Sequence, residues 1–372
     1  MLYLANAKGA GEAVKQKGEE AKKRRDEETW RRGGEEAKHG QSVLNSRVSA
    51  SLHPRVSTSS WIIGVDLGGT KIAAGLVNPQ NEIVKKVYVN TGISEGPPAV
   101  VERIAGCVEQ LYRALPAGEK VAAMGVCCPG PLDHVAGLVL DPPNLTGWIN
   151  VPLQRLLEER LGLPAPLEHD AKAAALGEFH FGAGRDTHDM VFIVVGTGVG
   201  AAIIINGELY RGPTNSAGEV GHITVDMNGP ACSCGSNGCV EVYVAGPDLA
   251  QRFREAVAGQ QVIVPENIDG RFVAGLAAQG QPQALEVFKG AGQALGVAIA
   301  TMAHLFDIDF YIIGGSVAQA GDLLLNPTRE AVRYRAFESI GSRVKVVASP
   351  LGDDAAILGC AWIARQTINN GQ

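Results

Sequence analysis

Three cysteines and one histidine lie close together in a glycine-rich segment, "HITVDMNGPACSCGSNGC", where they could bind a metal ion. The set is His222, Cys232, Cys234 and Cys239. Three thiolates and one imidazole are the ligands of a closed, tetrahedral zinc site. Because such a site has no open position for water or substrate, we predict that the Zn²⁺ is structural. The alternative is three free thiols beside an ordinary histidine.

A zinc-binding loop at residues 222–241 would also hold the side chains around it. Glu219 precedes this loop and Glu241 ends it, and neither carboxylate is needed as a ligand. Zinc would fix His222 and the backbone that carries the two glutamates. We therefore expect the loop to shape a binding site, while proton transfer takes place elsewhere.

Two glycine-rich turns could bind phosphate, although neither fits a common nucleotide motif. In "GVDLGGTK" (residues 64–71) the spacing fails the P-loop pattern, because Thr70 stands where that motif needs Lys. The "GTGVG" turn (196–200) is followed by a second strand-like run, whereas a dinucleotide fingerprint opens a helix.

Both turns instead predict hairpins whose backbone amides face one anion. Asp66, at the end of the preceding strand, could orient Mg²⁺ directly or through water. A third glycine turn, "IIGGS", follows a later buried run, and the three turns together favour nucleotide binding over simple tight hairpins. The residues expected at the nucleotide are Asp66, Gly68, Gly69, Thr70, Lys71, Gly196, Thr197, Gly198, Gly314 and Gly315.

Asp170 stands between a short predicted strand and the alanine-rich helix predicted at residues 171–182. Taken alone, an aspartate there is most simply a helix N-cap. Beside predicted phosphate-binding turns, a carboxylate at the end of a strand is also a candidate general base.

Composition indicates a folded protein without a membrane span. The chain has 372 residues, of which 45% are hydrophobic, and its 47 glycines cluster in short turns. The net charge of −6 argues against a specific nucleic-acid partner. No apolar run is long enough to cross a bilayer, and the N-terminus lacks the apolar core of a signal peptide. Seven cysteines, three of them clustered, fit a reducing compartment, so we expect a cytoplasmic protein.

The chain is expected to divide into an extension and two lobes. Residues 1–60 are charged and then serine-rich, without an apolar stripe, and are predicted to be a disordered extension. Residues 61–179 would form a small α/β lobe completed by a C-terminal helix at 353–372, and residues 180–352 a large α/β lobe. Each half begins with a strand, a glycine turn and a second strand, which suggests two similar lobes with a ligand between them.

The order of these motifs resembles the ROK family of repressors and sugar kinases. "DLGGTK", "PGPLD", "NLTGW", "EHDAKAAALGE", "GTGVG", "GEVGH", "CSCGSNGC-VE" and "IIGGS" occur in the family's order, from about Trp61 to near the C-terminus. The resemblance implies an actin-like ATPase (ribonuclease H-like) fold with a cleft between two α/β lobes. It also implies ATP-dependent phosphorylation of a hexose, most simply glucose to glucose 6-phosphate, by a homodimer or homotetramer.

The resemblance also assigns roles to individual residues. Asp170 would accept the proton of the attacking sugar hydroxyl. ATP phosphates would lie against the first two glycine turns and the adenosine near Gly314 and Gly315. The residues expected at the sugar are Gly130, Asn144, His169, Asp170, Glu219, His222 and Glu241.

Two positions depart from the family pattern and leave the sugar open. His169 replaces the usual Asn, and Lys172 stands where Asn is common. A kinase for another sugar, such as N-acetylmannosamine, fructose or mannose, is the first alternative. A sugar-sensing transcriptional regulator is the second, although the "DLGGTK" turn is complete.

Overall fold

Two five-stranded sheets with the same strand order organise residues 60–370, the part of the chain that the computed structural model describes. These residues belong to one unit, Arg55–Gln372. Apart from Ser60, the extension predicted at residues 1–60 lies outside the described residues.

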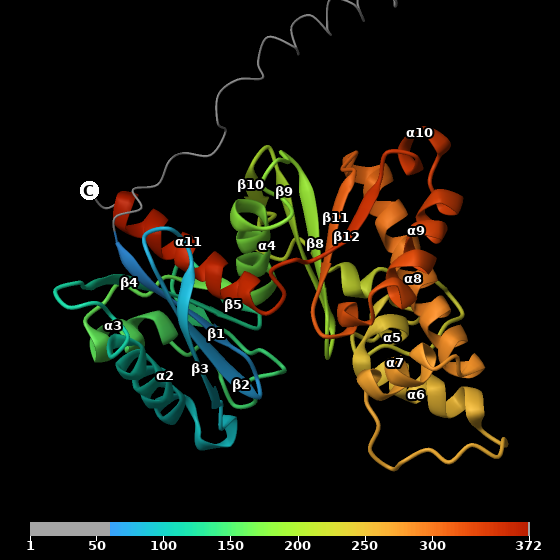
Figure 1. Ribbon diagram of the computed structural model, residues 1–372, viewed down its shortest axis with the longest axis horizontal. Helices are drawn as coiled ribbons and strands as arrows, with labels where there is room; N and C mark the ends of the chain where they lie inside the picture. Colours follow the sequence, from blue (N-terminus) through green and yellow to red (C-terminus); the bar gives the residue numbers. More distant parts are fainter. Residues whose placement is uncertain (1–59, 371–372) are drawn as a thin grey trace, which may run out of the picture. The chain divides into compact units, whose positions relative to one another are not determined.

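The first sheet has the order β3-β2-β1-β4-β7 (Figure 1). Strands β1, β2 and β3 are antiparallel neighbours, whereas β4 and β7 run parallel to β1. Strand β3 lies at one edge of this sheet and β7 at the other. The bounds are β1 (Trp61–Leu67), β2 (Lys71–Val77), β3 (Ile83–Asn90), β4 (Val121–Cys128) and β7 (Leu167–His169), with a separate hairpin of β5 (Leu132–Asp133) and β6 (Leu138–Val139).

The second sheet repeats this plan in the order β10-β9-β8-β11-β12. Again a three-stranded antiparallel meander is extended by two parallel strands. The two strand–glycine turn–strand units predicted from the sequence are therefore the matching hairpins β1–β2 and β8–β9. The bounds are β8 (Met190–Val195), β9 (Val199–Ile205), β10 (Glu208–Tyr210), β11 (Phe310–Gly314) and β12 (Lys345–Ala348).

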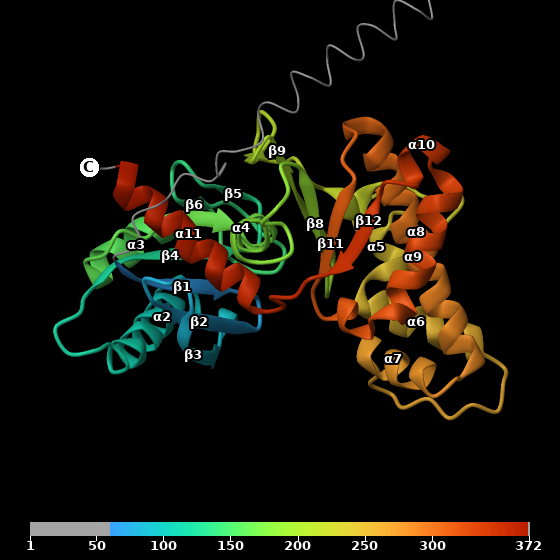
Figure 2. The same cartoon turned by 45° about the horizontal axis from the view of Figure 1, so that its top comes forward.

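Helices complete each α/β half. Helices α5 to α9 lie beside the second sheet, on the side away from the first (Figures 1 and 2). The bounds are α2 (Pro97–Tyr112), α3 (Leu153–Leu161), α4 (Asp170–Phe181), α5 (Glu241–Val244), α6 (Gly246–Val257), α7 (Gly270–Ala278), α8 (Pro282–Phe306), α9 (Asp322–Arg335), α10 (Glu338–Gly341) and α11 (Asp354–Asn370), with 3₁₀ turns η1 (Ile93–Glu95), η2 (Val220–His222) and η3 (Val317–Ala320).

Strand β1 is apolar on both faces because helices cover both. Ile63 belongs to the same buried cluster as Ile104 of α2. Its neighbour Ile62 points to the opposite face, where it clusters with Ile357 and Leu358 of α11. Cover on both faces of the sheet explains why the strand shows a continuous apolar run rather than alternation.

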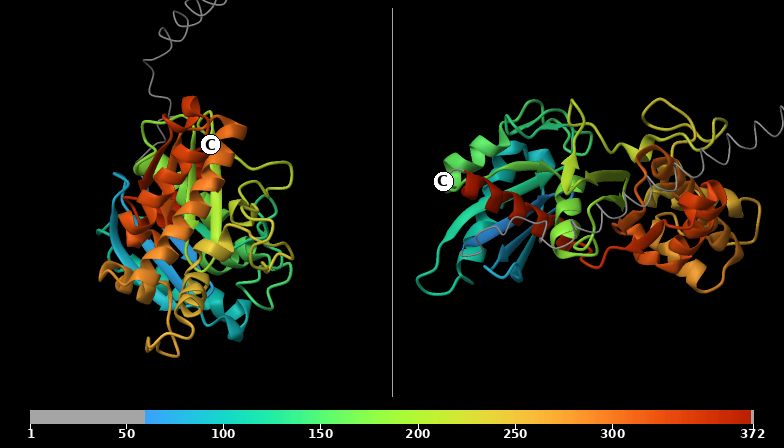
Figure 3. Two further views of the ribbon diagram at one scale, coloured as in Figure 1. Left: turned by 90° about the vertical axis from the view of Figure 1, so that its right-hand side faces the viewer. Right: turned by 90° about the horizontal axis from the view of Figure 1, so that it is seen from above.

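Helices α4 and α11 pack against each other between the two sheets (Figure 3). Their backbones approach very closely: a Cβ at Gly177 would lie 2.0 Å from the carbonyl oxygen of Ala355, and one at Gly359 would lie 1.7 Å from that of Ala173. Only glycine fits at such a crossing. This contact fixes the start of α4, where Asp170 is located. The predicted lobe boundaries at 179–180 and 352–353 remain predictions.

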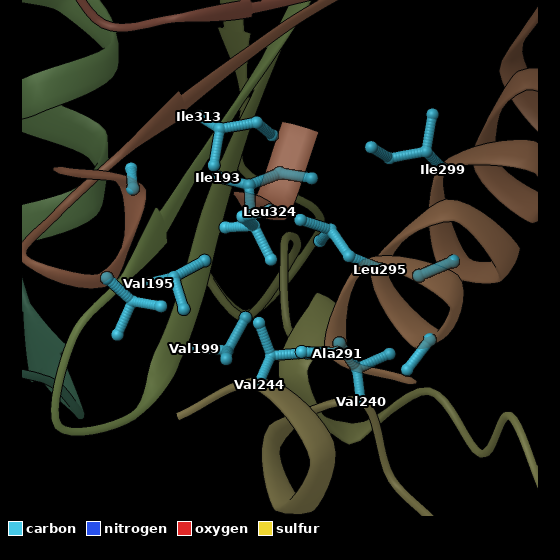
Figure 4. Packing of buried hydrophobic residues seen from close by; sticks show 14 of the residues in the cluster. Ile193, Val195, Val199, Val240, Val244, Ala291, Leu295, Ile299, Ile313 and Leu324 are labelled. Atoms are coloured by element: carbon cyan, nitrogen blue, oxygen red, sulfur yellow. The ribbon is translucent and has the colours of Figure 1, made fainter. Parts of the chain in front are cut away.

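The core of the second half lies between its sheet and α8 (Figure 4). Ile193 and Ile313 of neighbouring strands point toward Leu295 and Ile299 of α8, and all four are fully buried. This packing anchors β8 and β9, so the glycine turn between them is held by a rigid base. None of the helices in residues 60–370 combines the length and apolar character needed to cross a bilayer.

Candidate active site

A cavity of about 510 Å³ brings together most of the residues predicted to act on a ligand. Both sheets contribute to its walls. The predicted residues that line it are Gly68, Gly69, Thr70, Gly130, Asn144, His169, Asp170, Gly196, Thr197, Gly198, Glu219, His222 and Glu241. Asp66, Lys71, Gly314 and Gly315 are not among the lining residues.

The first phosphate-type turn is held in shape by Thr91. Its hydroxyl donates to the carbonyl of Gly68 at 2.7 Å, and its amide donates to that of Thr70 at 2.9 Å. A Cβ at Gly69 would lie 2.7 Å from the carbonyl oxygen of Asn144, so only glycine fits there. The turn expected to hold phosphate thus lies directly against a residue expected to contact the sugar.

Asp66 and Lys71 flank this turn but do not line the cavity. Burial raises the pKa of Asp66 to about 6, with a smaller contribution from the negative charge of Asp170, while a contact from Cys127 opposes the shift. Cys127 Sγ lies 3.5 Å from Oδ1 of Asp66. The ammonium of Lys71 lies 3.6 Å from a carboxylate oxygen of Asp353 and 5.1 Å from the ring centre of Tyr88, on an exposed surface.

The second phosphate-type turn is tied to the loop that ends in Glu241. The carboxylate of Glu241 accepts a 2.9 Å hydrogen bond from the amide of Val199. A Cβ at Gly198 would lie 2.7 Å from the same carboxylate. The amide of Gly246 donates to the carbonyl of Gly196 at 2.8 Å, which joins the start of α6 to the turn.

Asp170 is the first residue of α4, and His169 occupies the N-cap position that the sequence suggested for Asp170. The Asp170 carboxylate accepts a 2.6 Å hydrogen bond from the amide of Ala171 and is 41% exposed. The ring of His169 packs against Gly130, where a Cβ would lie 2.7 Å from its Cδ2. Together these contacts direct a partly solvated carboxylate and an imidazole into the same cavity.

The four predicted metal ligands come together as expected. Their ligand atoms lie within 4.8 Å of one another. His222 Nδ1 lies 3.7 Å from Cys232 Sγ, and the sulfurs of Cys234 and Cys239 are also 3.7 Å apart. Zinc–sulfur bonds of about 2.3 Å in a tetrahedron place two sulfurs about 3.8 Å apart, so the spacing fits zinc. Since Nδ1 of His222 faces the cysteines, its Nε2 is left for the cavity that His222 also lines.

A second cavity of about 640 Å³ adjoins the first through Gly196 and Thr197, which line both. Arg271 at the start of α7 and Gln319 in η3 line it, together with Ser316. Gly314 and Gly315 lie behind it: a Cβ at Gly315, whose φ is +87°, would lie 2.3 Å from the carbonyl oxygen of Val195. These glycines therefore let the chain pass close to β8 and place η3 at the cavity.

Several lining residues were missed by sequence reasoning. Arg271 and Gln319 lie in stretches without a motif. Asp269 could have marked the start of α7, where Arg271 lies, because an aspartate is a typical helix N-cap. Its carboxylate accepts a 2.9 Å hydrogen bond from the amide of Phe272. Lys172 and Asn215 line the first cavity, and Lys172 had been noted only as a departure from a family pattern.

Comparison with known proteins places nearly all of the described region in one family. The ROK family model matches residues 62–367. A glucokinase from Thermotoga maritima is 37% identical, and the match spans 82% of this chain and 98% of that protein. A putative xylose repressor from Caldicellulosiruptor is 35% identical over 80% of this chain and 76% of that protein. An N-acetylmannosamine kinase from Escherichia fergusonii is 34% identical over 82% of this chain and 98% of that protein.

Solved structures agree with the sequence matches. The crystal structure of a ROK family glucokinase from Streptomyces griseus, in complex with glucose and AMPPNP, superposes with a TM-score of 0.70 and is 36% identical. The match covers 82% of this chain and the whole of the Streptomyces griseus chain. The fold is thus that of the actin-like ATPases, with two α/β halves, and the chain belongs to the ROK family.

Proposed function

We propose that this protein phosphorylates glucose with ATP and that Asp170 is its general base. The protein is an ATP-dependent sugar kinase, as its similarity to glucokinases and to a glucokinase with bound glucose and AMPPNP supports. The observation that supports the finer proposal is that Asp170 lines one cavity with the two glycine turns and with Asn144, Glu219 and His222.

The chemistry follows from this arrangement. Sugar hydroxyls are bound by groups that donate and accept at once, such as the Asn144 amide, and by acceptors such as Glu219 and Glu241. The Asp170 carboxylate accepts the proton of the hydroxyl that attacks the terminal phosphorus of ATP. Amides of the turns at Gly68–Thr70 and Gly196–Gly198 stabilise phosphate charge, and positioning supplies most of the remaining barrier reduction.

Two metal ions fit the residues present. Asp66 is suited to orient Mg²⁺, because a partly buried carboxylate beside the negative charge of Asp170 is one that a cation would stabilise. Mg²⁺ bound with ATP would neutralise part of the phosphate charge. Zn²⁺ held by His222, Cys232, Cys234 and Cys239 would stabilise the loop that positions Glu219 and Glu241.

The nucleotide is proposed to extend from the first cavity into the second. The shared residues Gly196 and Thr197 join the two spaces. Phosphates at the glycine turns would direct the adenosine toward Arg271, Ser316 and Gln319. The guanidinium of Arg271 can stack on a flat base as well as donate hydrogen bonds.

Two broader proposals accompany the activity. None of the seven cysteines is paired in a disulfide in the structure, which supports a reducing compartment such as the cytoplasm. Resemblance to the family supports a homodimer or homotetramer.

A coupled ADP-release assay with Mg-ATP tests the sugar directly. The panel is glucose, mannose, fructose, N-acetylglucosamine and N-acetylmannosamine. We expect the highest kcat/KM with glucose. A preference for N-acetylmannosamine would retain the kinase and overturn glucose as the substrate, and sugar binding without any turnover would favour a sensor.

A further inference from the structure

The residues two positions before and two positions after Asp170 bind the same short loop. Glu168 is 1% exposed, and its two carboxylate oxygens accept from the two terminal nitrogens of Arg211 at 3.0 and 2.6 Å. Lys172 is 3% exposed, and its ammonium donates to the backbone carbonyl of Asn215 at 2.5 Å and to its side-chain oxygen at 2.8 Å.

These two contacts form one network. Arg211 also donates to the side-chain oxygen of Asn215, at 3.2 Å, so that Asn215 accepts from both cations. The loop is closed by a 3.0 Å hydrogen bond from the amide of Ala217 to the carbonyl of Arg211. Directly after Ala217 the chain reaches Gly218 and Glu219, which line the cavity.

The segment that carries Asp170 needs such support. Strand β7 has only three residues and lies at the edge of the first sheet, where it pairs with β4 alone. The loop follows β10 of the second sheet. Asp170, the candidate base, directly follows β7 of the first sheet. The network therefore joins the segment that carries Asp170 to the candidate sugar-binding loop that follows β10 of the second sheet.

We propose that the Glu168–Arg211 and Lys172–Asn215 contacts act as a clamp that positions the Asp170 carboxylate relative to the loop carrying Glu219. The inference rests on the proposed role of Asp170. All four are positioning residues, since they act through Asp170 and Glu219. A displacement of about 1 Å in a reacting group can cost about 100-fold in rate, so a loosened clamp lowers kcat.

The principal test is Arg211→Lys, which keeps the positive charge but cannot reproduce the two-pronged contact with Glu168. The matched control is Arg160→Lys. Arg160 also makes a two-pronged contact with a carboxylate, from its Nε and Nη2 to Glu102 at 2.8 and 3.0 Å, on an exposed surface outside both cavities. We expect kcat for glucose to fall about 10- to 100-fold in Arg211→Lys and to be unchanged in the control.

Three readouts separate positioning from loss of structure. The glucose dissociation constant, measured by titration calorimetry, should change less than about threefold while kcat falls. Arg211→Lys should have no further effect on the residual kcat of Asp170→Asn, since a group that acts through Asp170 has nothing left to position. Asn215→Ala keeps the Glu168–Arg211 pair and serves as a second, milder variant, with an expected fall in kcat of about tenfold.

Equal kcat in Arg211→Lys, Asn215→Ala and the control would overturn the clamp and leave the kinase proposal standing. So would a fall in kcat that is fully explained by the fraction of unfolded protein in thermal melts. A wild-type protein without turnover on any sugar would overturn both proposals together, because no base would then need positioning.

Discussion

Nδ1 of His169 lies 3.1 Å from Oδ1 of Asp170, so an imidazole adjoins the carboxylate proposed as the base. The nitrogen is buried and has no hydrogen-bond partner among the described residues, so the contact lacks hydrogen-bond geometry. The position differs from the family's usual asparagine. We therefore interpret His169 as the residue most able to alter sugar selectivity.

His169→Asn should shift the choice of sugar more than the rate. The smaller carboxamide leaves space beside Gly130 and changes which hydroxyl or amide of the sugar can be bonded. We expect the ratio of kcat/KM for glucose to that for N-acetylmannosamine to change by at least about tenfold. His188→Asn, at an exposed position outside the cavities, is the control. Equal ratios in both variants and the parent would remove His169 from the specificity site.

Removal of one metal ligand should release zinc and loosen the sugar site. In Cys234→Ser we expect plasma emission spectrometry to show less than one zinc per chain, where the parent carries about one. We also expect the melting temperature to fall by roughly 5–10 °C and KM for the sugar to rise. Ser236→Ala changes an exposed residue of the same loop and should alter none of these. Stoichiometric zinc in Cys234→Ser, with unchanged melting, would contradict the predicted ligand set.

In the absence of Mg²⁺ and nucleotide, Asp66→Asn should raise the free energy of unfolding, and the increase should be larger at higher pH. The pKa of Asp66 is about 6 in the folded protein against 3.8 for the free group. Between these values the folded state holds a proton that the unfolded state has lost, so stability from this group falls as pH rises from about 4 to 6 and is then constant. The substitution should add about 3 kcal/mol at pH 7.5 and little at pH 4. Urea unfolding at both pH values measures this, and equal gains would refute the burial of an ionised Asp66.

Arg271→Ala should weaken ATP binding and leave KM for the sugar unchanged. If adenosine occupies the second cavity, loss of the guanidinium should raise KM for ATP about fivefold or more through lost stacking and hydrogen bonding. Arg333→Ala, an exposed residue of α9 outside both cavities, is the matched control. An unchanged KM for ATP would show that the adenine does not bind against Arg271.

Local features of the site could be predicted from the sequence because they depend on residues that are close together in the chain. The hairpin β1–β2 follows from two apolar runs separated by Gly68 and Gly69. The four metal ligands span only residues 222–239, so their proximity needs little more than a folded loop. The start of α4 was predicted within one residue for the same reason.

Long-range placement could not be predicted in this way. Lys71 follows a glycine turn, yet its side chain lies toward Asp353 and does not line the cavity. Arg211 and Asn215 meet Glu168 and Lys172 across 43 residues, and no local periodicity marks such a contact. Gly314 and Gly315, which are predicted at the nucleotide, also lie close to Phe192 and Val195, a contact that no local pattern marks.

The most direct test of the account is phosphorus NMR of the product formed from glucose and Mg-ATP by the parent protein and by Asp170→Asn. We predict a glucose 6-phosphate signal with the parent and a rate lower by about 1,000-fold or more in the variant, with glucose binding retained. Equal rates in the two proteins would contradict Asp170 as the base. A parent protein that binds glucose and forms no phosphorylated product would contradict the central claim.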